Sequence, residues 1–140
     1  MSISLSAYLV TDGNGAEAVE FYKDALGAEV LMSQTFGEAP SNPDYPTPEE
    51  AKNRIMHAHL KVGSSDLMLS DTFPGMPHVK GNHVTISINV TDASEAKTIF
   101  NKLQQGGEVG MPLQETFWSP AYGQVTDKYG VTFHVSTAGQ

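Results

Sequence analysis

The stretch FYKDALGAEVLM (residues 21–32) decides the fold, because a related stretch, FNKLQQGGEVGM (residues 100–111), follows it 79 residues later. The Phe, the Gly, the Glu-Val pair and the Met recur at matching positions. One constant offset in a chain of 140 residues indicates two copies of one structural unit. We therefore expect Phe21 and Phe100 to be equivalent core residues on equivalent helices, and a site in a cleft between the two copies.

Each copy begins with the pattern of a strand followed by a helix. Residues 8–10 predict the first strand, and Asn14 with Glu17 three residues later predicts the cap of a helix that Gly27 ends. In the second copy, residues 83–90 alternate between apolar and polar side chains, which predicts a strand. Asp92 then predicts the cap of the second helix, and Gly106-Gly107 its end.

Each copy continues with three further strands. The predicted strands cover residues 29–36, 54–62 and 67–70 in the first copy, and a strand from Glu108 followed by the hairpin 123–126 and 131–136 in the second. Residues 67–69 align with 133–135 at an offset of 66, which is smaller than 79 because the first copy carries extra residues at 37–52. This insertion contains four prolines, and we expect a mobile loop that borders a pocket and ends in a short helix with Pro48 at its first position.

The predicted fold class is therefore α+β, with two βαβββ modules in a single domain of residues 1–140. The first module spans residues 1–72 with its insertion at 37–52, and the second spans residues 80–140. Each module has one apolar sheet face, so we expect the sheets to form a curved, half-open barrel with a central cleft and the helices outside.

The composition excludes several classes of partner. The formal net charge of −8 argues against nucleic acid and against an anionic membrane surface, both of which attract basic proteins. The absence of Cys excludes disulfides, a thiolate nucleophile and Cys-ligated zinc. The first residues lack the basic region and the apolar run of a signal peptide, so the expected location is cytoplasmic.

The predicted architecture resembles the vicinal oxygen chelate superfamily, which includes glyoxalases, extradiol dioxygenases and bleomycin-binding proteins, and within it the PhnB-like subgroup. The resemblance covers nearly the whole chain. The residues that carry it are Gly13 to Ala18 leading into Phe21-Tyr22, His57-Ala58, Leu67 to Asp71, Asn82 to Val84, Gly107 to Leu113, and Phe117-Trp118 with Gly123, Asp127 and Gly130.

The resemblance implies where a metal site would lie. Metal-dependent members use a His or Glu from the first and last strands of each module. His134 falls at one such position and Met68 at its partner position, while Thr85, with His83 two residues earlier on the same face, falls at the third. The fourth position falls near Leu5, which cannot bind a metal. We therefore expect no complete metal site and no cofactor.

Further candidate residues come from two clusters. His57 and His59 share one face of a predicted strand. They could act as metal ligands or as general bases, or they could simply be a pair that is hydrogen-bonded to loops. Phe117, Trp118 and Tyr122 precede the last hairpin and suit a flat or apolar ligand, although they could equally anchor a loop on the core. The predicted pocket residues are His57, His59, Met68, His83, Thr85, Phe117, Trp118, Tyr122 and His134.

Three functions remain open from the sequence. The first is a PhnB-like protein that binds a small organic molecule in an aromatic cleft, and the alternative is a metal-dependent lyase, isomerase or dioxygenase of the same superfamily. The third is a cofactor-independent enzyme with His57 or His134 as base, so whether the chain is an enzyme stays undecided. The resemblance and the open sheet edges also imply a homodimer.

Overall fold

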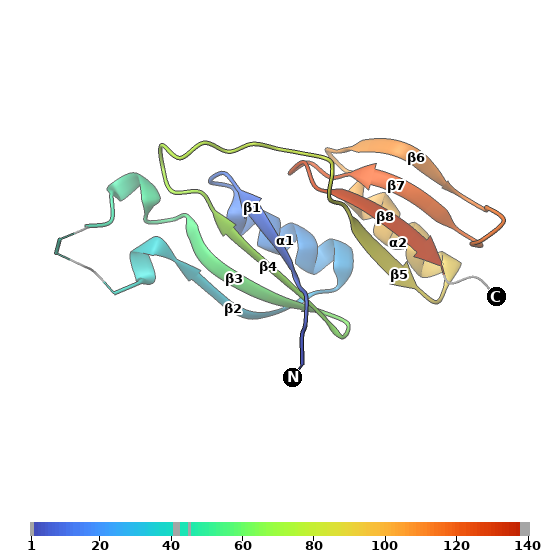
Figure 1. Cartoon of the computed structure of the whole chain (residues 1–140), viewed down its shortest axis with the longest axis horizontal. Coiled ribbons are helices and arrows are strands. Elements are labelled where there is room, and N and C mark those ends of the chain that lie inside the picture. The colour runs from blue at the N-terminus through green and yellow to red at the C-terminus, as the bar shows by residue number, and fades with distance from the viewer. Residues whose placement is uncertain (1, 41–42, 45, 138–140) are drawn as a thin grey trace. The chain divides into compact units, whose positions relative to one another are not determined.

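A computed structural model describes residues 2–40, 43–44 and 46–137. By its internal contacts the chain divides into two units, Met1–Val79 and Lys80–Gln140, and each contains one βαβββ module (Figure 1). Each module is a four-stranded mixed sheet with one helix, so the predicted α+β class and two-module arrangement are confirmed. Among the described residues, no helix is long and apolar enough to cross a membrane.

The first module consists of β1 (Ala7–Thr11), α1 (Gly15–Leu26), β2 (Glu29–Thr35), β3 (Ile55–Val62) and β4 (Ser65–Asp71). Its strands lie in the order β1-β4-β3-β2, and only the β1–β4 pair is parallel. Helix α1 covers one face of this sheet (Figure 1). Burial of apolar side chains from the helix and from alternate strand positions forms the core of the module.

The second module repeats this plan with β5 (Ile86–Val90), α2 (Ala93–Leu103), β6 (Glu108–Gln114), β7 (Tyr122–Thr126) and β8 (Thr132–Thr137). Its strand order is β5-β8-β7-β6. Met68 pairs with Tyr8 in the first sheet, and His134 pairs with Ser87 in the second. The offsets of 79 for the first strand and 66 for the last strand are therefore both confirmed by the strand register.

The helices repeat with an offset of 78 rather than 79, so the predicted equivalence of Phe21 and Phe100 is wrong by one residue. The helix caps are Asn14 and Asp92, and the fully buried Tyr22 corresponds to Phe100, whereas Phe21 is only half-buried. The turn before α2 and the helix itself are each one residue shorter than in the first module, and the turn after α2 is two residues longer. These changes cancel, which is why the flanking strands keep the offset of 79.

The two helices begin in different ways. Asp92 caps α2 locally, because its carboxylate accepts a hydrogen bond of 3.1 Å from the Ser94 N–H. The predicted capping side chain of Asn14 makes no such bond in α1. The buried Asp71, from the end of β4, accepts the Gly15 N–H at 2.9 Å instead, so the first helix is capped by a residue distant in sequence.

The strand predicted at residues 83–90 begins only at Ile86. His83 and Thr85 lie in the exposed segment before it, so both predicted site residues fall outside the sheet. The alternation of polar and apolar residues begins at His83, three residues before the strand itself. The strand begins at Ile86 because its neighbour in the sheet, β8, pairs with β5 only from Ile86 onward.

The insertion at 37–52 is tied at its base. The Phe36 N–H donates to the Arg54 carbonyl and the Gly37 N–H donates to the Lys52 carbonyl, each at 3.0 Å. The predicted short helix is a 3-10 turn, Glu49–Ala51, and Pro48 precedes it as the cap rather than occupying its first position. Ser41, Asn42 and Tyr45 of the predicted loop lie outside the described residues.

Candidate functional site

Each sheet has one face that packs on the helix of its module and one face that does not. Along β7 and β8, Val125, Phe133 and Val135 are buried beneath α2. Strand alternation places Tyr122 and His134 on the opposite face, where both side chains remain partly accessible. Polar and aromatic groups on such an open face are available to a ligand.

The open face of the second sheet carries a connected cluster of aromatic and polar side chains. The Tyr122 hydroxyl lies 2.6 Å from His134 Nδ1, and the Gln124 amide donates to the same hydroxyl at 3.2 Å. Trp118 meets the Tyr122 ring edge-on, with 5.4 Å between the ring centroids, and Phe117 meets Trp118 at 4.8 Å. Four predicted site residues, Phe117, Trp118, Tyr122 and His134, therefore lie together.

The hydrogen bonds around Tyr122 are consistent with one arrangement of the proton of neutral His134. Because the tyrosine oxygen accepts from Gln124, its own proton is free to be donated to His134 Nδ1. A neutral imidazole that accepts at Nδ1 carries its hydrogen at Nε2. Within the described part of the chain Nε2 has no hydrogen-bond partner, so the cluster presents one N–H donor to the open face.

The loop that carries Trp118 is held by polar bonds and not by its aromatic residues. Ser119 is buried, and its hydroxyl lies 2.8 Å from the Ala121 carbonyl and 2.6 Å from the Thr137 carbonyl. Thr116 accepts hydrogen bonds from the N–H groups of Trp118 and Ser119. Trp118 remains 49% exposed, so it is held in place by its backbone while its ring stays accessible.

In the first module the two predicted histidines have different partners. His57 Nδ1 lies 3.0 Å from the hydroxyl of Tyr8, whose side chain reaches it across β4. His59 Nε2 lies 2.9 Å from a carboxylate oxygen of Asp66, and this bond is the main reason why the pKa of Asp66 is lowered. A lowered carboxyl pKa stabilises the fold above the ordinary carboxyl range, and the effect is lost as pH falls through the lowered value. The His59 side chain is therefore hydrogen-bonded to a neighbouring strand of its own sheet.

The strand positions that would hold the superfamily's metal do not fit a divalent ion. By register, the paired positions of the first and last strands are Tyr8 with Met68, and Ser87 with His134. Ser87, and not the predicted Thr85, stands opposite His134. A thioether and neutral hydroxyls are poor ligands for hard divalent ions, which leaves one imidazole in the set. In the described ranges no group of three or more His, Asp and Glu side chains could hold a metal ion.

Gln124 and Tyr8 are hydrogen-bonded to predicted site residues, or to their partners, but were not among the residues that the sequence analysis named. Gln124 follows Tyr122 at a spacing of two, so strand alternation alone could have placed it on the same face. Tyr8 could not be found in this way, because its contact with His57 depends on β4 lying between β1 and β3. The side chains of His83 and Thr85 make no hydrogen bond or ion pair with any residue that the structure describes.

The model of the Glyoxalase/Bleomycin resistance protein/Dioxygenase superfamily matches residues 4–135, so the chain belongs to this superfamily. Protein YjdN of Escherichia coli strain K12 is 34% identical over 147 residues, covering 97% of this chain and 96% of YjdN. The crystal structure of protein PA1353 from Pseudomonas aeruginosa covers 99% of this chain and 100% of its own, with a TM-score of 0.86 and 38% identity.

A structure described as a PhnB protein from Bacillus cereus has the same fold. It covers 97% of this chain and 100% of its own, with a TM-score of 0.79 at 22% identity. The predicted superfamily is therefore confirmed, and the neighbour is consistent with the predicted PhnB-like subgroup.

Proposed function

We propose that this protein binds a small, flat organic molecule on the open face of its second sheet, against Trp118, Tyr122 and His134. The observation that carries the proposal is the hydrogen-bonded row Gln124–Tyr122–His134, which ends in an unused N–H donor beside an accessible indole ring. Binding sites for small molecules combine an apolar or aromatic surface with a few placed polar groups.

The cluster favours a ligand with a hydrogen-bond acceptor at one end. The N–H at His134 Nε2 needs a carbonyl or similar oxygen, while the Trp118 ring offers a surface for stacking. No acidic side chain is hydrogen-bonded to this cluster in the part of the chain that is described. A neutral carbonyl compound with an aromatic ring therefore matches the site.

The alternative, a metal-dependent lyase, isomerase or dioxygenase, would need more ligands than the strand positions provide. The single imidazole of His134 would leave a hard ion largely bound to water and weakly held. Binding of one divalent ion per chain at micromolar affinity or tighter, abolished by His134→Ala, would establish that alternative and refute the proposal.

We predict that acetophenone quenches the fluorescence of this protein in a saturable way. Trp118 is the only Trp in the sequence, so its emission reports on the site alone. His134→Ala should raise the apparent dissociation constant about three- to tenfold, because one hydrogen bond is lost. Fluorescence titration of the wild type and the variant measures both effects.

Two controls make this titration decisive. Ethylbenzene has the same ring without the carbonyl oxygen, so it should bind more weakly, and His134→Ala should not alter its binding. His83→Ala changes an exposed histidine outside the cluster and should leave the acetophenone titration unchanged. Quenching that rises linearly with concentration, and equally in the His134→Ala variant, would refute the proposed site.

We also propose that the protein is a homodimer. Several apolar side chains remain exposed in the segment before β1 and in the segment between the modules, among them Leu5 at 95% and Val79 at 87%. Groups of exposed apolar residues are typical of surfaces that a partner covers. Sedimentation at micromolar concentration should give twice the chain mass of 15.1 kDa, and a single 15.1 kDa species would contradict the proposal.

A further inference from the structure

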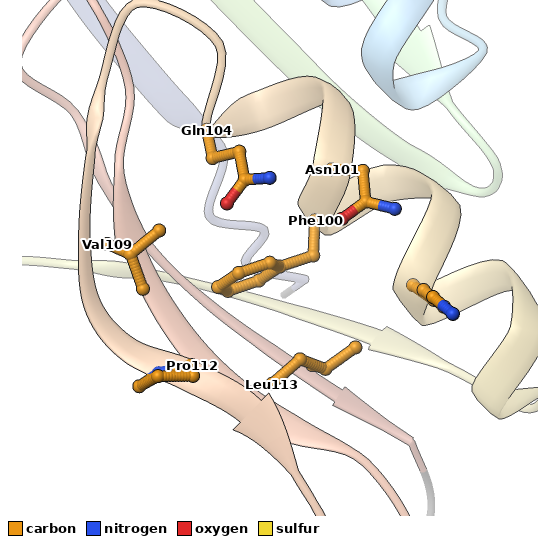
Figure 2. A pocket seen from close by; sticks show the side chains of 7 residues that line it. Phe100, Asn101, Gln104, Val109, Pro112 and Leu113 are labelled. Atoms are coloured by element: carbon orange, nitrogen blue, oxygen red, sulfur yellow. The ribbon is translucent and has the colours of Figure 1, made fainter.

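A hollow lies on the helix side of the second sheet, between α2 and β6 (Figure 2). Its volume is about 560 Å³, within the usual range for small-molecule pockets. Phe100 lies in its centre, with Val109, Pro112 and Leu113 of β6 on one side, and Asn101 of α2 and Gln104, which follows the helix, on the other (Figure 2). Lys97 completes the lining.

Strand β6 is irregular where it borders the hollow. The pairing of β6 with β7 shifts by one residue between Val109 and Met111 and again between Met111 and Gln114. Pro112 lies within the second shift and has no N–H to donate, which suits an edge strand. These irregularities interrupt the regular pairing of the strand beside α2, and Phe100 is left as the apolar floor.

The helix position of Lys97 carries a different type of residue in the first module. At the helix offset of 78, Val19 of α1 corresponds to Lys97 of α2. Val19 is only 5% exposed and packs in the core, whereas Lys97 is exposed. The module fold therefore accommodates a buried apolar side chain here, and the second module has a cation in its place.

The polar groups around the hollow are unused. The side chains of Lys97, Asn101 and Gln104 form no hydrogen bond or ion pair within the described ranges; Lys97 and Asn101 lie on α2, and Gln104 caps its C-terminus. A free ammonium is notable in a chain with a net charge of −8, because carboxylates are available in excess to pair with it. An unpaired cation beside two amides and an apolar floor is complementary to an anion with an apolar body.

We propose that the α2–β6 pocket binds a small organic carboxylate, with the carboxylate at Lys97 and the apolar body against Phe100 and Leu113. Asn101 and Gln104 supply amide donors to the same head group. This site lies on the helix side of the sheet, away from the Trp118 cluster on the open face, and does not depend on the function proposed above.

The test is a nuclear magnetic resonance titration of the full chain with 4-phenylbutyrate. Saturable shifts should appear at the backbone amides of residues 97–113 and at the side-chain amides of Asn101 and Gln104. The neutral analogue 4-phenylbutanamide should bind about two- to fivefold more weakly, as expected for loss of one exposed ion pair. Lys97→Gln should reduce binding of the acid to the level of the amide.

Three variants serve as controls. Lys102→Gln removes a charge from the same helix outside the pocket, so binding of the acid should not change. Val109→Phe fills the hollow from a partly exposed position and should abolish binding of acid and amide alike, while His134→Ala should leave both unchanged. Equal affinities for acid and amide, no effect of Lys97→Gln, or shifts confined to the Trp118 face would each overturn the proposal.

Discussion

Asp71→Ala is expected to lower the free energy of unfolding by at least about 3 kcal/mol, because it leaves several buried donors unpaired. The Asp71 side chain is buried, and one of its oxygens accepts from Thr11 Oγ1 at 2.7 Å and from the N–H groups of Gly13 and Gly15 at 2.8 and 2.9 Å. Its other oxygen accepts from the Ile55 N–H at 2.7 Å. Urea unfolding followed by circular dichroism measures the change.

Two matched variants test this explanation. Asp71→Asn keeps one acceptor oxygen for Thr11, Gly13 and Gly15 but turns an amide N–H₂ toward the Ile55 N–H, so about 1 to 3 kcal/mol should be lost. Asp92→Ala removes an exposed cap with one bond to Ser94 and should cost about 1 kcal/mol. If Asp71→Ala cost no more than Asp92→Ala, Asp71 would be a simple helix cap and not the junction of four segments.

Gln124→Glu is expected to move the proton of His134 from Nε2 to Nδ1. A carboxylate at position 124 accepts from the Tyr122 hydroxyl, which then has to accept from His134 and requires a hydrogen at Nδ1. In the arrangement proposed for the wild type, the same hydroxyl donates to Nδ1. Nitrogen-15 spectra of the imidazole at mildly alkaline pH distinguish the two forms through the shifts of both ring nitrogens.

The move of the His134 proton to Nδ1 should also weaken the binding of the ligand. With neutral His134 protonated at Nδ1, Nε2 becomes an acceptor, and acetophenone loses its hydrogen bond at the site. Gln124→Met preserves the size of the side chain without polar atoms and should leave the wild-type form of the imidazole in place. A wild-type spectrum with the hydrogen at Nδ1 would show that Tyr122 accepts from His134, contrary to the proposed arrangement.

The proximity of Trp118, Tyr122 and His134 follows from local signals in the sequence. Trp118, Tyr122 and His134 lie within 17 positions of one another, and the last hairpin brings the two strands into register. Strand alternation then places Tyr122 and His134 on one face. The prediction for Thr85 failed, because the strand was extended past its pairing partner and only the register with β8 identifies Ser87 opposite His134.

The sequence by itself determined the repeat, the order of the elements and the end of α1 at Gly27, since each depends on residues close together in the chain. The predicted end of α2 at Gly106-Gly107 is wrong, because the helix ends at Leu103 with Gln104 as its cap. Tertiary structure alone decided which residues meet across strands that are not neighbours in sequence. The Tyr8–His57 contact and the capping of α1 by Asp71 both require β1 to lie parallel to β4. The one-residue shift between Phe21 and Tyr22 was decided by burial, because compensating changes in two turns leave no mark on the flanking repeat.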